Sequence, residues 1–248
     1  MKQPYIERKF FFCTYARIIL QDELLKCLIR EKAHSYIVGV SHTAMSFERP
    51  VSVRKKKTLN IHLAKPMDDV FRGFNDTARN EIRRAERMSE LRFTVNDNNW
   101  SDVYALYKTH RKARGLPLHP LSFLQNCLLF NAYWNEKLVS TVTCYDAYPF
   151  LRIQNIFSRI EHERADPRES RRVAGFAARR LVYEICKYGN AKGYQLLDMA
   201  SVNLTDPAKK GITAFKSSFG GEVADEFTYT YKGFIPRMVG GMRRFLSL

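Results

Sequence analysis

The stretch from Ser170 to Lys192 constrains the fold more than any other part of the sequence. Its apolar residues recur at intervals of three and four, as on one face of a helix, and Gly193 follows as a stop signal. The stripe consists of Val173, Phe176, Ala177, Leu181, Ile185 and Tyr188. A helix with such a stripe must be buried against another layer. Because strand-like segments precede and follow it, the sequence predicts a sheet as that layer.

The segments around this helix form an ordered series. Strands are expected at 58–64, 91–95, 138–145, 151–159, 194–200 and 226–233, and helices at 67–88, 100–115, 119–130, 170–192 and 211–219. The turn-forming DAYP between the two central strands indicates that they pair in antiparallel fashion. The order β-α-β-α-α-β-β-α-β-α-β predicts an α/β protein with a mixed, mostly antiparallel sheet flanked by helices.

The first 55 residues form a separate, shorter series. QDELLKCLIREK has helical spacing and SYIVGV resembles a buried strand. The basic run RPVSVRKKKT follows, and we interpret it as a connection or an exposed hairpin arm. We therefore expect a small N-terminal α/β extension at residues 1–55 and a main domain at residues 56–248.

The charge balance narrows the classes of partner. Lys and Arg number 41 against 25 Asp and Glu, a net charge of +16. Such an excess favours polyanionic partners, namely nucleic acid, phosphorylated cofactors, nucleotide-linked sugars or anionic lipid, without choosing among them. The basic stretches RKKK and RNEIRRAER match no RNA-reading motif, which favours a solvated surface over an RNA-binding face.

The spacing of the cysteines and histidines bears on metal binding, and the length of the apolar segments bears on cellular location. The five cysteines are widely spaced without a C-x-x-C pair, and the six histidines form no H-x-x-x-H or H-E-x-x-H pattern. We therefore expect reduced thiols, no disulfide framework and no metal site. No uninterrupted apolar run approaches the roughly 20 residues that cross a bilayer. A cytoplasmic location is expected, with the inner membrane surface as an alternative reached through the basic face.

Four stretches in order carry a resemblance to a known family. They are TARNEIRRAERM (77–88), YALYKTHRKARG (104–115), AKGYQLLDMA (191–200) and GITAFKSSFGGE (211–222). Together they resemble the GNAT acyltransferase superfamily, and more closely its FemAB-like branch, which includes aminoacyltransferases that build peptidoglycan cross-bridges. Those enzymes carry two complete GNAT-like domains, whereas residues 1–55 are too short for a full first copy. The resemblance implies a GNAT-like fold with an incomplete first copy.

The resemblance also implies a donor-binding segment. The superfamily's signature, Arg/Gln-x-x-Gly-x-Gly/Ala at a helix start, is matched by RVAGFA, with Arg172, Gly175 and Ala177. A helix N-terminus offers unpaired N–H groups and a positive dipole end, which suit the pyrophosphate of acyl-CoA, and Arg171 and Val173 lie beside it. The alternative is that the small residues let the helix pack closely on the sheet, with the arginines solvated.

Lys216 and Asp198 are the candidates for the reacting end of the site. The resemblance implies that Lys216, in a Phe-Lys-x-x-Phe-Gly pattern, approaches the transferred acyl group or a substrate phosphate. Its flanking Phe215 anchors the stem, so that the ammonium can stabilise negative charge. The alternative is a surface lysine on a short amphipathic helix.

Asp198 is an acid within the apolar strand LLDMA. It is expected either to orient the acceptor or serve as a base, or to accept backbone N–H bonds that hold the next loop. Asn203 and Tyr229, near the same end, are assigned with Phe215 to substrate binding.

These observations lead to one functional prediction and two alternatives. The chain is predicted to be an N-acyltransferase that moves an acyl group from acyl-CoA to an amine, which the resemblance places on a cell-envelope sugar or precursor. The first alternative is an aminoacyltransferase that uses aminoacyl-tRNA and a peptidoglycan precursor. The second is a non-catalytic module that binds polyanions or a membrane surface, with the tail MVGGMRRFLSL as its docking helix.

Overall fold

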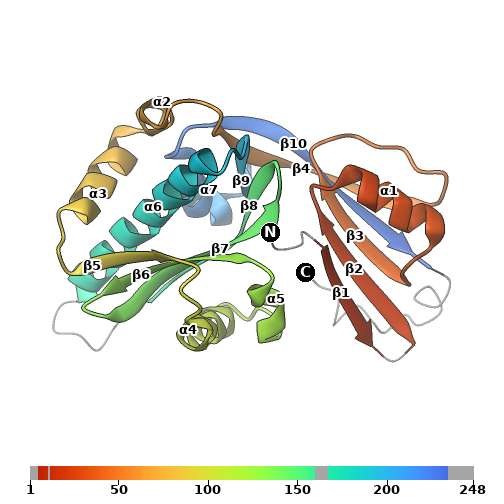
Figure 1. Cartoon of the computed structure of the whole chain (residues 1–248), viewed down its shortest axis with the longest axis horizontal. Helices are drawn as coiled ribbons and strands as arrows, with labels where there is room; N and C mark the ends of the chain where they lie inside the picture. Colours follow the sequence, from red (N-terminus) through yellow and green to blue (C-terminus); the bar gives the residue numbers. More distant parts are fainter. Residues whose placement is uncertain (1–4, 11, 160–166, 234–248) are drawn as a thin grey trace.

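A single sheet runs through the molecule (Figure 1). The computed structural model describes residues 5–10, 12–159 and 167–233. The strands are β1 (Tyr5–Phe10), β2 (Cys13–Ile19), β3 (Tyr36–Ser41), β4 (Val51–His62), β5 (Leu91–Val95), β6 (Leu128–Trp134), β7 (Lys137–Ala147), β8 (Phe150–Ser158), β9 (Leu196–Val202) and β10 (Glu222–Lys232). Their spatial order is β1-β2-β3-β10-β4-β9-β8-β7-β6-β5. Only β2–β3 and β8–β9 pair in parallel within these ranges, so the expected mixed, mostly antiparallel sheet is confirmed.

The helices cover the sheet on both faces. They are α1 (Asp22–Glu31), α2 (Met67–Arg72), α3 (Asp76–Glu86), α4 (Trp100–Ala113), α5 (Leu121–Gln125), α6 (Pro167–Ala191) and α7 (Lys210–Ser217), with a 3₁₀ turn at Pro207–Lys209. α2, α3, α6 and α7 lie on one face, α4 and α5 lie on the other, and α1 covers the N-terminal strands (Figure 1). The apolar stripe of α6 therefore packs against the apolar side chains of the sheet.

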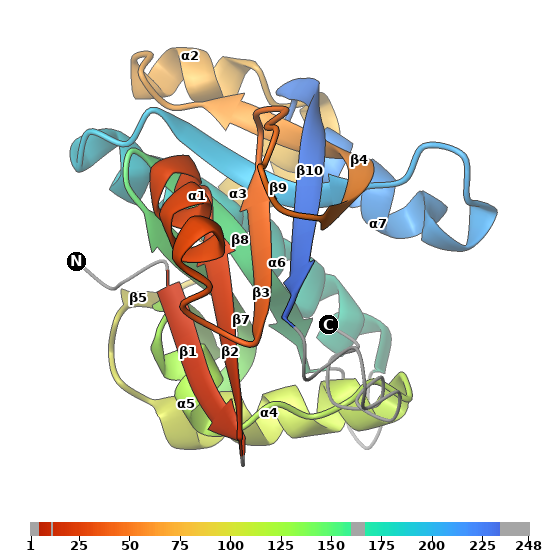
Figure 2. The same ribbon diagram turned by 90° about the vertical axis from the view of Figure 1, so that its right-hand side faces the viewer.

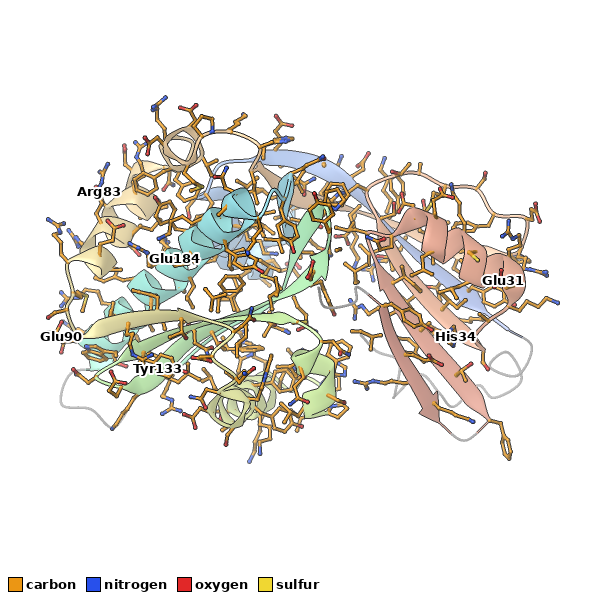
Figure 3. All side chains as sticks on the ribbon, viewed as in Figure 1. Glu31, His34, Arg83, Glu90, Tyr133 and Glu184 are labelled. Carbon is orange, nitrogen blue, oxygen red and sulfur yellow. The ribbon has the colours of Figure 1, made fainter. Side chains whose placement is uncertain are left out.

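The stripe of α6 is buried as its periodicity predicts. Val173, Ala177, Leu181 and Ile185 are at most 1% exposed and belong to the main apolar cluster, against which Tyr188 also packs. Charged side chains join α6 to the neighbouring α3 at the edge of this core, where Glu81 accepts from Arg179 at 2.8 Å. Glu184 lies on α6, and the exposed Arg83 lies on α3 (Figure 3).

Two expected helices differ from the structure. The helix expected at 67–88 is two helices, because the Asn75 side chain accepts from the backbone N–H of Ala78 and starts α3 as a new N-cap. The helix expected at 119–130 ends with α5, and the strand β6 follows. Every residue of β6 is buried, so its apolar run lacks the alternation that separates a strand from a buried helix.

The N-terminal part shares its sheet with the rest of the chain. β10, from the far end of the described chain, pairs with β3 on one side and with β4 on the other (Figure 2). The basic run RPVSVRKKKT, interpreted as a connection or an exposed hairpin arm, lies in β4 from Val51 onward, and so does residue 55. A boundary between residues 55 and 56 therefore falls inside a strand, and the division into an N-terminal part at residues 1–55 and a main domain at residues 56–248 stays a prediction.

Candidate active site at the separation of β8 and β9

The sheet opens in its middle, between the parallel strands β8 and β9. Their residues pair at Phe150–Leu196, Leu151–Leu197 and Arg152–Asp198, and no further pairing follows, although β8 continues to Ser158 and β9 to Val202. Two residues beyond Asp198, Ala200 has a φ of 60°, which few residues other than glycine adopt. The two strands thus diverge where charged side chains meet.

A buried ion network occupies the point of divergence. Arg152 contacts Asp198 through Nη1, and its Nη2 donates to Glu226 of β10 at 2.6 Å. Asp198 is fully buried, and Glu226 and Arg152 are 1% and 6% exposed. Glu226 also accepts from the Ser201 hydroxyl at 3.0 Å. Paired charges with complete hydrogen bonding can persist in the interior, whereas unpaired ones cannot.

Asp198 is held in its ionised form by its neighbours. Besides Arg152, it contacts the Thr58 hydroxyl, accepts from the backbone N–H of Ala200 at 2.7 Å, and lies 3.0 Å from His42 Nε2. Burial raises the pKa of Asp198, but the Arg152 cation and the hydrogen bonds from His42 and Thr58 outweigh burial and hold that pKa well below its usual range. A carboxylate with these partners is a poor proton acceptor and a good anchor.

Lys216 reaches the same place from α7. Its Nζ donates to the carbonyl oxygens of Ala200 at 3.2 Å and Ser201 at 2.8 Å, and the residue is only 9% exposed. Burial lowers the pKa of Lys216 to about 8, and the nearby Asp198 carboxylate opposes this shift. The lysine is thus not a surface residue, and the structure brings the two candidates for the reacting end together.

A cavity adjoins the network on the face of the sheet that carries α4 and α5. Its volume is about 280 Å³. Residues 152–155 of β8 and 200–201 of β9 line it on one side, and β2 and β3 contribute Arg17, Val38 and Val40 on the other. The cavity therefore lies between the N-terminal strands and the divergent part of the sheet, and side chains from both parts enclose it.

The predicted donor-binding residues lie elsewhere. Arg171 and Arg172 are exposed on α6, whereas Val173 and Ala177 are buried in the core. Gly175 is partly exposed, and a Cβ added there would have no neighbour nearer than Glu81, at 4.0 Å. The described lining of the cavity includes no residue of α6. Residues 160–166, directly before α6, lie outside the described chain, and donor binding by this helix stays a prediction.

The three predicted substrate-binding residues have local contacts of their own. Asn203 Oδ1 accepts from the backbone N–H of Thr205 at 3.1 Å and Asp206 at 3.0 Å, which forms a turn after β9. Phe215 stacks edge-on against Phe219, with ring centroids 5.3 Å apart.

Tyr229 donates to the carbonyl of Thr43 at 2.9 Å and packs beneath α1, away from the cavity. The structure does not bring these three residues together, and their roles in substrate binding stay predictions.

Sequence reasoning missed Arg152, Glu226 and Arg17. Arg152 interrupts the otherwise apolar start of a strand, and Glu226 occupies an inward position of β10. The charge of Arg152 within an apolar run was the available signal, whereas Glu226 falls on the polar side of the alternating EFTYTYK and nothing in the sequence marked it. The partners could not be read from the sequence, because they lie on strands that are distant along the chain.

The described ranges contain no group of three or more His, Cys, Asp or Glu side chains placed to hold a metal ion, and all five cysteines are free thiols. None of their helices combines the length and the apolar character needed to span a membrane.

Comparison with known proteins gives likeness in structure alone. No family model and no curated protein matches the sequence. Among solved structures, FemX has a TM-score of 0.65 at 13% identity, over 95% of this chain and 86% of its own. L-PGS from Bacillus licheniformis has a TM-score of 0.55 at 12% identity, over 98% and 86%. A C-terminal domain (DUF2156) from Agrobacterium fabrum, assigned to a lysylphosphatidylglycerol synthetase, has a TM-score of 0.53 at 10% identity, over 92% and 81%.

The likeness to FemX includes the N-terminal part. Residues 1–55 make up more than a fifth of the 248-residue chain, so coverage of 95% extends well into them. The resemblance inferred from four short stretches is confirmed at the level of the fold. The chain has a GNAT-like fold and is similar to FemX over nearly its whole length.

Proposed function

We propose that the chain is an N-acyltransferase whose reaction takes place where β8 and β9 diverge. The observation that carries this proposal is the buried Lys216 ammonium at the carbonyls of Ala200 and Ser201, directly beside the unpaired stretch of both strands. Strands that stop pairing leave backbone donors and acceptors for an extended ligand. A positive charge held in a water-poor place can stabilise negative charge as it develops.

The residues have distinct roles in this mechanism. The acceptor amine attacks the donor's carbonyl carbon, and the carbonyl oxygen becomes an oxyanion. The oxyanion then re-forms the carbonyl, the bond to the leaving group breaks, and the leaving group takes the proton that the amine gives up. Lys216, mostly protonated at neutral pH because its pKa is about 8, stabilises the oxyanion together with backbone N–H groups. Asp198 does not take the proton. It fixes Arg152 and His42, and is a positioning residue. Catalysis then rests mainly on orientation and electrostatics.

Acyl-CoA is the proposed donor. Arg171 and Arg172 are exposed in the first turns of α6 and available to a diphosphate. The acceptor is proposed to be an amine on a cell-envelope sugar or precursor, at the cytoplasmic side of the membrane.

Aminoacyl-tRNA is the second candidate donor. Arg83, Arg84 and Arg87 form an exposed basic surface on and just after α3 that can contact a nucleic-acid backbone. The likeness to a domain assigned to a lysylphosphatidylglycerol synthetase, whose name denotes an aminoacylated product, also favours it.

Calorimetric titration with acetyl-CoA, longer acyl-CoAs and aminoacyl-tRNA tests the proposal. Binding of an acyl-CoA supports the first donor, and binding of tRNA that weakens steeply with salt supports the second. Lys216→Met should then retain donor binding and lose at least tenfold in transfer, whereas Lys209→Met, an exposed lysine nearby, should change neither. If no donor binds, or if Lys216→Met transfers at the wild-type rate, the proposal is wrong.

A further inference from the structure

Another cavity lies where α6 ends, beside the turn between β7 and β8 (Figure 1 and Figure 2). Its volume is about 620 Å³. Its lining includes Asp146 at the end of β7, Tyr148 in the turn, Tyr188 and Lys192 at the end of α6, and Tyr194 before β9. The strands β8 and β9 begin and pair at this end and diverge further along. This cavity is therefore separate from the proposed site of transfer.

Three aromatic rings form a tyrosine wall in this cavity, made of Tyr148, Tyr188 and Tyr194. Tyr194 is the central ring, and its centroid lies 5.4 Å from that of Tyr148 and 6.3 Å from that of Tyr188. The ring planes are inclined by 69° and 34°, so the three rings do not form a parallel stack. Because the face of an aromatic ring carries partial negative charge, it attracts cations. The wall therefore suits a positively charged ligand.

A buried carboxylate adds negative charge behind the tyrosine wall. Asp146 is 4% exposed, and its Oδ1 accepts from the Tyr194 hydroxyl at 2.7 Å. Burial raises the pKa of Tyr194, and the hydrogen bond to Asp146 and the charge of Asp146 raise it further. Burial also raises the pKa of Tyr188, and the same carboxylate adds to that shift. The field of Asp146 therefore reaches two of the three rings.

The end of α6 is a second source of negative potential. The helix ends at Ala191, and Tyr188 and Lys192 on either side of that residue line the cavity. The C-terminal end of a helix dipole is negative and favours a cation nearby. Lys192 opposes a cationic ligand, but the residue is exposed, so its ammonium can extend into water.

We propose that this cavity binds a quaternary ammonium group, with the tyrosine wall in contact with the cation and Asp146 as the opposite charge. A quaternary ammonium has no N–H, so it needs no hydrogen-bond acceptor and can be held by ring faces and electrostatic attraction. At about 620 Å³ the cavity has the size of a pocket for a whole small molecule, so it can also hold the part that carries the cation. This site goes beyond the proposed transfer reaction and does not depend on it.

Other classes of ligand fit this cavity less well. An anion would be repelled by Asp146 and by the negative end of α6. A hard metal ion needs several oxygen ligands, and the described part of the chain holds no cluster of three or more acids, histidines or cysteines that could supply them. An uncharged apolar ligand would gain nothing from the carboxylate. The tyrosine wall and the carboxylate together therefore favour an organic cation.

An NMR titration of the full chain with choline tests the site. We expect saturable shifts of the backbone N–H signals of residues 188–194, which include two rings of the tyrosine wall. The uncharged isostere 3,3-dimethylbutan-1-ol has carbon in place of the nitrogen and should bind at least about tenfold more weakly, because it lacks the attraction to the rings and the carboxylate. Absence of choline-dependent shifts, or equal affinity for the isostere, overturns the site.

Variants of Tyr148 test the contact with the ring. Tyr148 is 53% exposed, so its replacement should leave folding intact, which circular dichroism checks. Tyr148→Leu should weaken choline binding by about three- to thirtyfold, whereas Tyr148→Phe, which keeps the ring, should stay within about threefold of wild type. Phe12→Leu is the matched control, because Phe12 is an exposed aromatic residue between β1 and β2. Lys192→Met, which removes a like charge, should strengthen binding by up to about fivefold.

Two further outcomes decide the contact and the source of the cation. Equal weakening by Tyr148→Leu and Tyr148→Phe, or a loss in Phe12→Leu as large as in Tyr148→Leu, would show that the tyrosine wall does not hold the cation. Retention of the chain on phosphatidylcholine vesicles, with release by free choline, would assign the ammonium to a lipid headgroup. Choline binding without such retention would assign it to a free small molecule.

Discussion

Arg152 and Asp198 are partners twice over, once in the backbone register of β8 and β9 and once through a buried ion pair between their side chains. They are the last residues at which the two strands pair. The ion pair thus lies where backbone hydrogen bonding between the strands ends, and Glu226 extends it to β10. Since β10 also pairs with β3, the network connects the divergent strands to the N-terminal part.

Asp198→Asn should strongly destabilise the fold. Removing one partner of a buried ion pair leaves the other charge uncompensated, which costs about 3–5 kcal/mol. Urea unfolding of wild type and variant measures this free energy. Asp225→Asn is the control, because Asp225 is an acid on β10 paired with Lys55 and Lys57 near the surface. Equal effects of the two substitutions would contradict a special role for the buried pair.

Asp198 should also contribute to the fall in the free energy of unfolding at acid pH. Its pKa is lower in the folded than in the unfolded state, where aspartate titrates near 3.9, so the contribution is fully present above about pH 5. Below about pH 4 the unfolded state binds the additional proton, and the free energy of unfolding falls by up to about 1.4 kcal/mol per pH unit. Thermal or urea unfolding at pH 3–6 measures this slope. The slope should be smaller in Asp198→Asn, and an unchanged slope would refute the assignment.

Lys216 should contribute to a rise in the free energy of unfolding at alkaline pH. Burial lowers its pKa to about 8 from 10.5, so between these values the folded state holds fewer protons than the unfolded state. The contribution of Lys216 to the unfolding free energy therefore increases with pH in that window and is constant below it. Unfolding at pH 7–10.5 should show a smaller rise for Lys216→Met than for wild type. Lys209→Met, which removes an exposed lysine, should keep the wild-type rise.

Gly220, in the Phe-Lys-x-x-Phe-Gly pattern, should tolerate no side chain. Its φ is 67°, and a Cβ there would overlap the carbonyl oxygen of Gly73. Gly220→Ala should lower the unfolding free energy by about 1–3 kcal/mol. Gly115→Ala has a similar φ of 61° with open space around it, and isolates the backbone part of that loss. Gly211→Ala, in α7 with open space, should be neutral or stabilising by up to about 1 kcal/mol. A Gly220→Ala protein as stable as Gly115→Ala would exclude the close approach.

Much of the fold could be predicted from short-range pattern. The stripe of α6 and the alternation of residues 58–64 and of β10 depend on neighbours a few residues away, so each was recognisable before any contact was known. β6 was not, because it is buried on both faces and reads as a continuous apolar run. Likewise Lys216 and Asp198 could be selected as unusual residues in apolar settings, but their partners could not.

The sequence alone therefore determined the layered α/β character and the excess of positive charge. It also identified Lys216 and Asp198 as candidate residues of the site. Tertiary structure decided which strands became neighbours. Inserting β10 between β3 and β4 brings Glu226 to Arg152, and the N-terminal strand β2 brings Arg17 to the cavity beside them. Pairing between distant strands depends on the burial of whole faces rather than on local periodicity. A site made from several strands exists only once the sheet has formed.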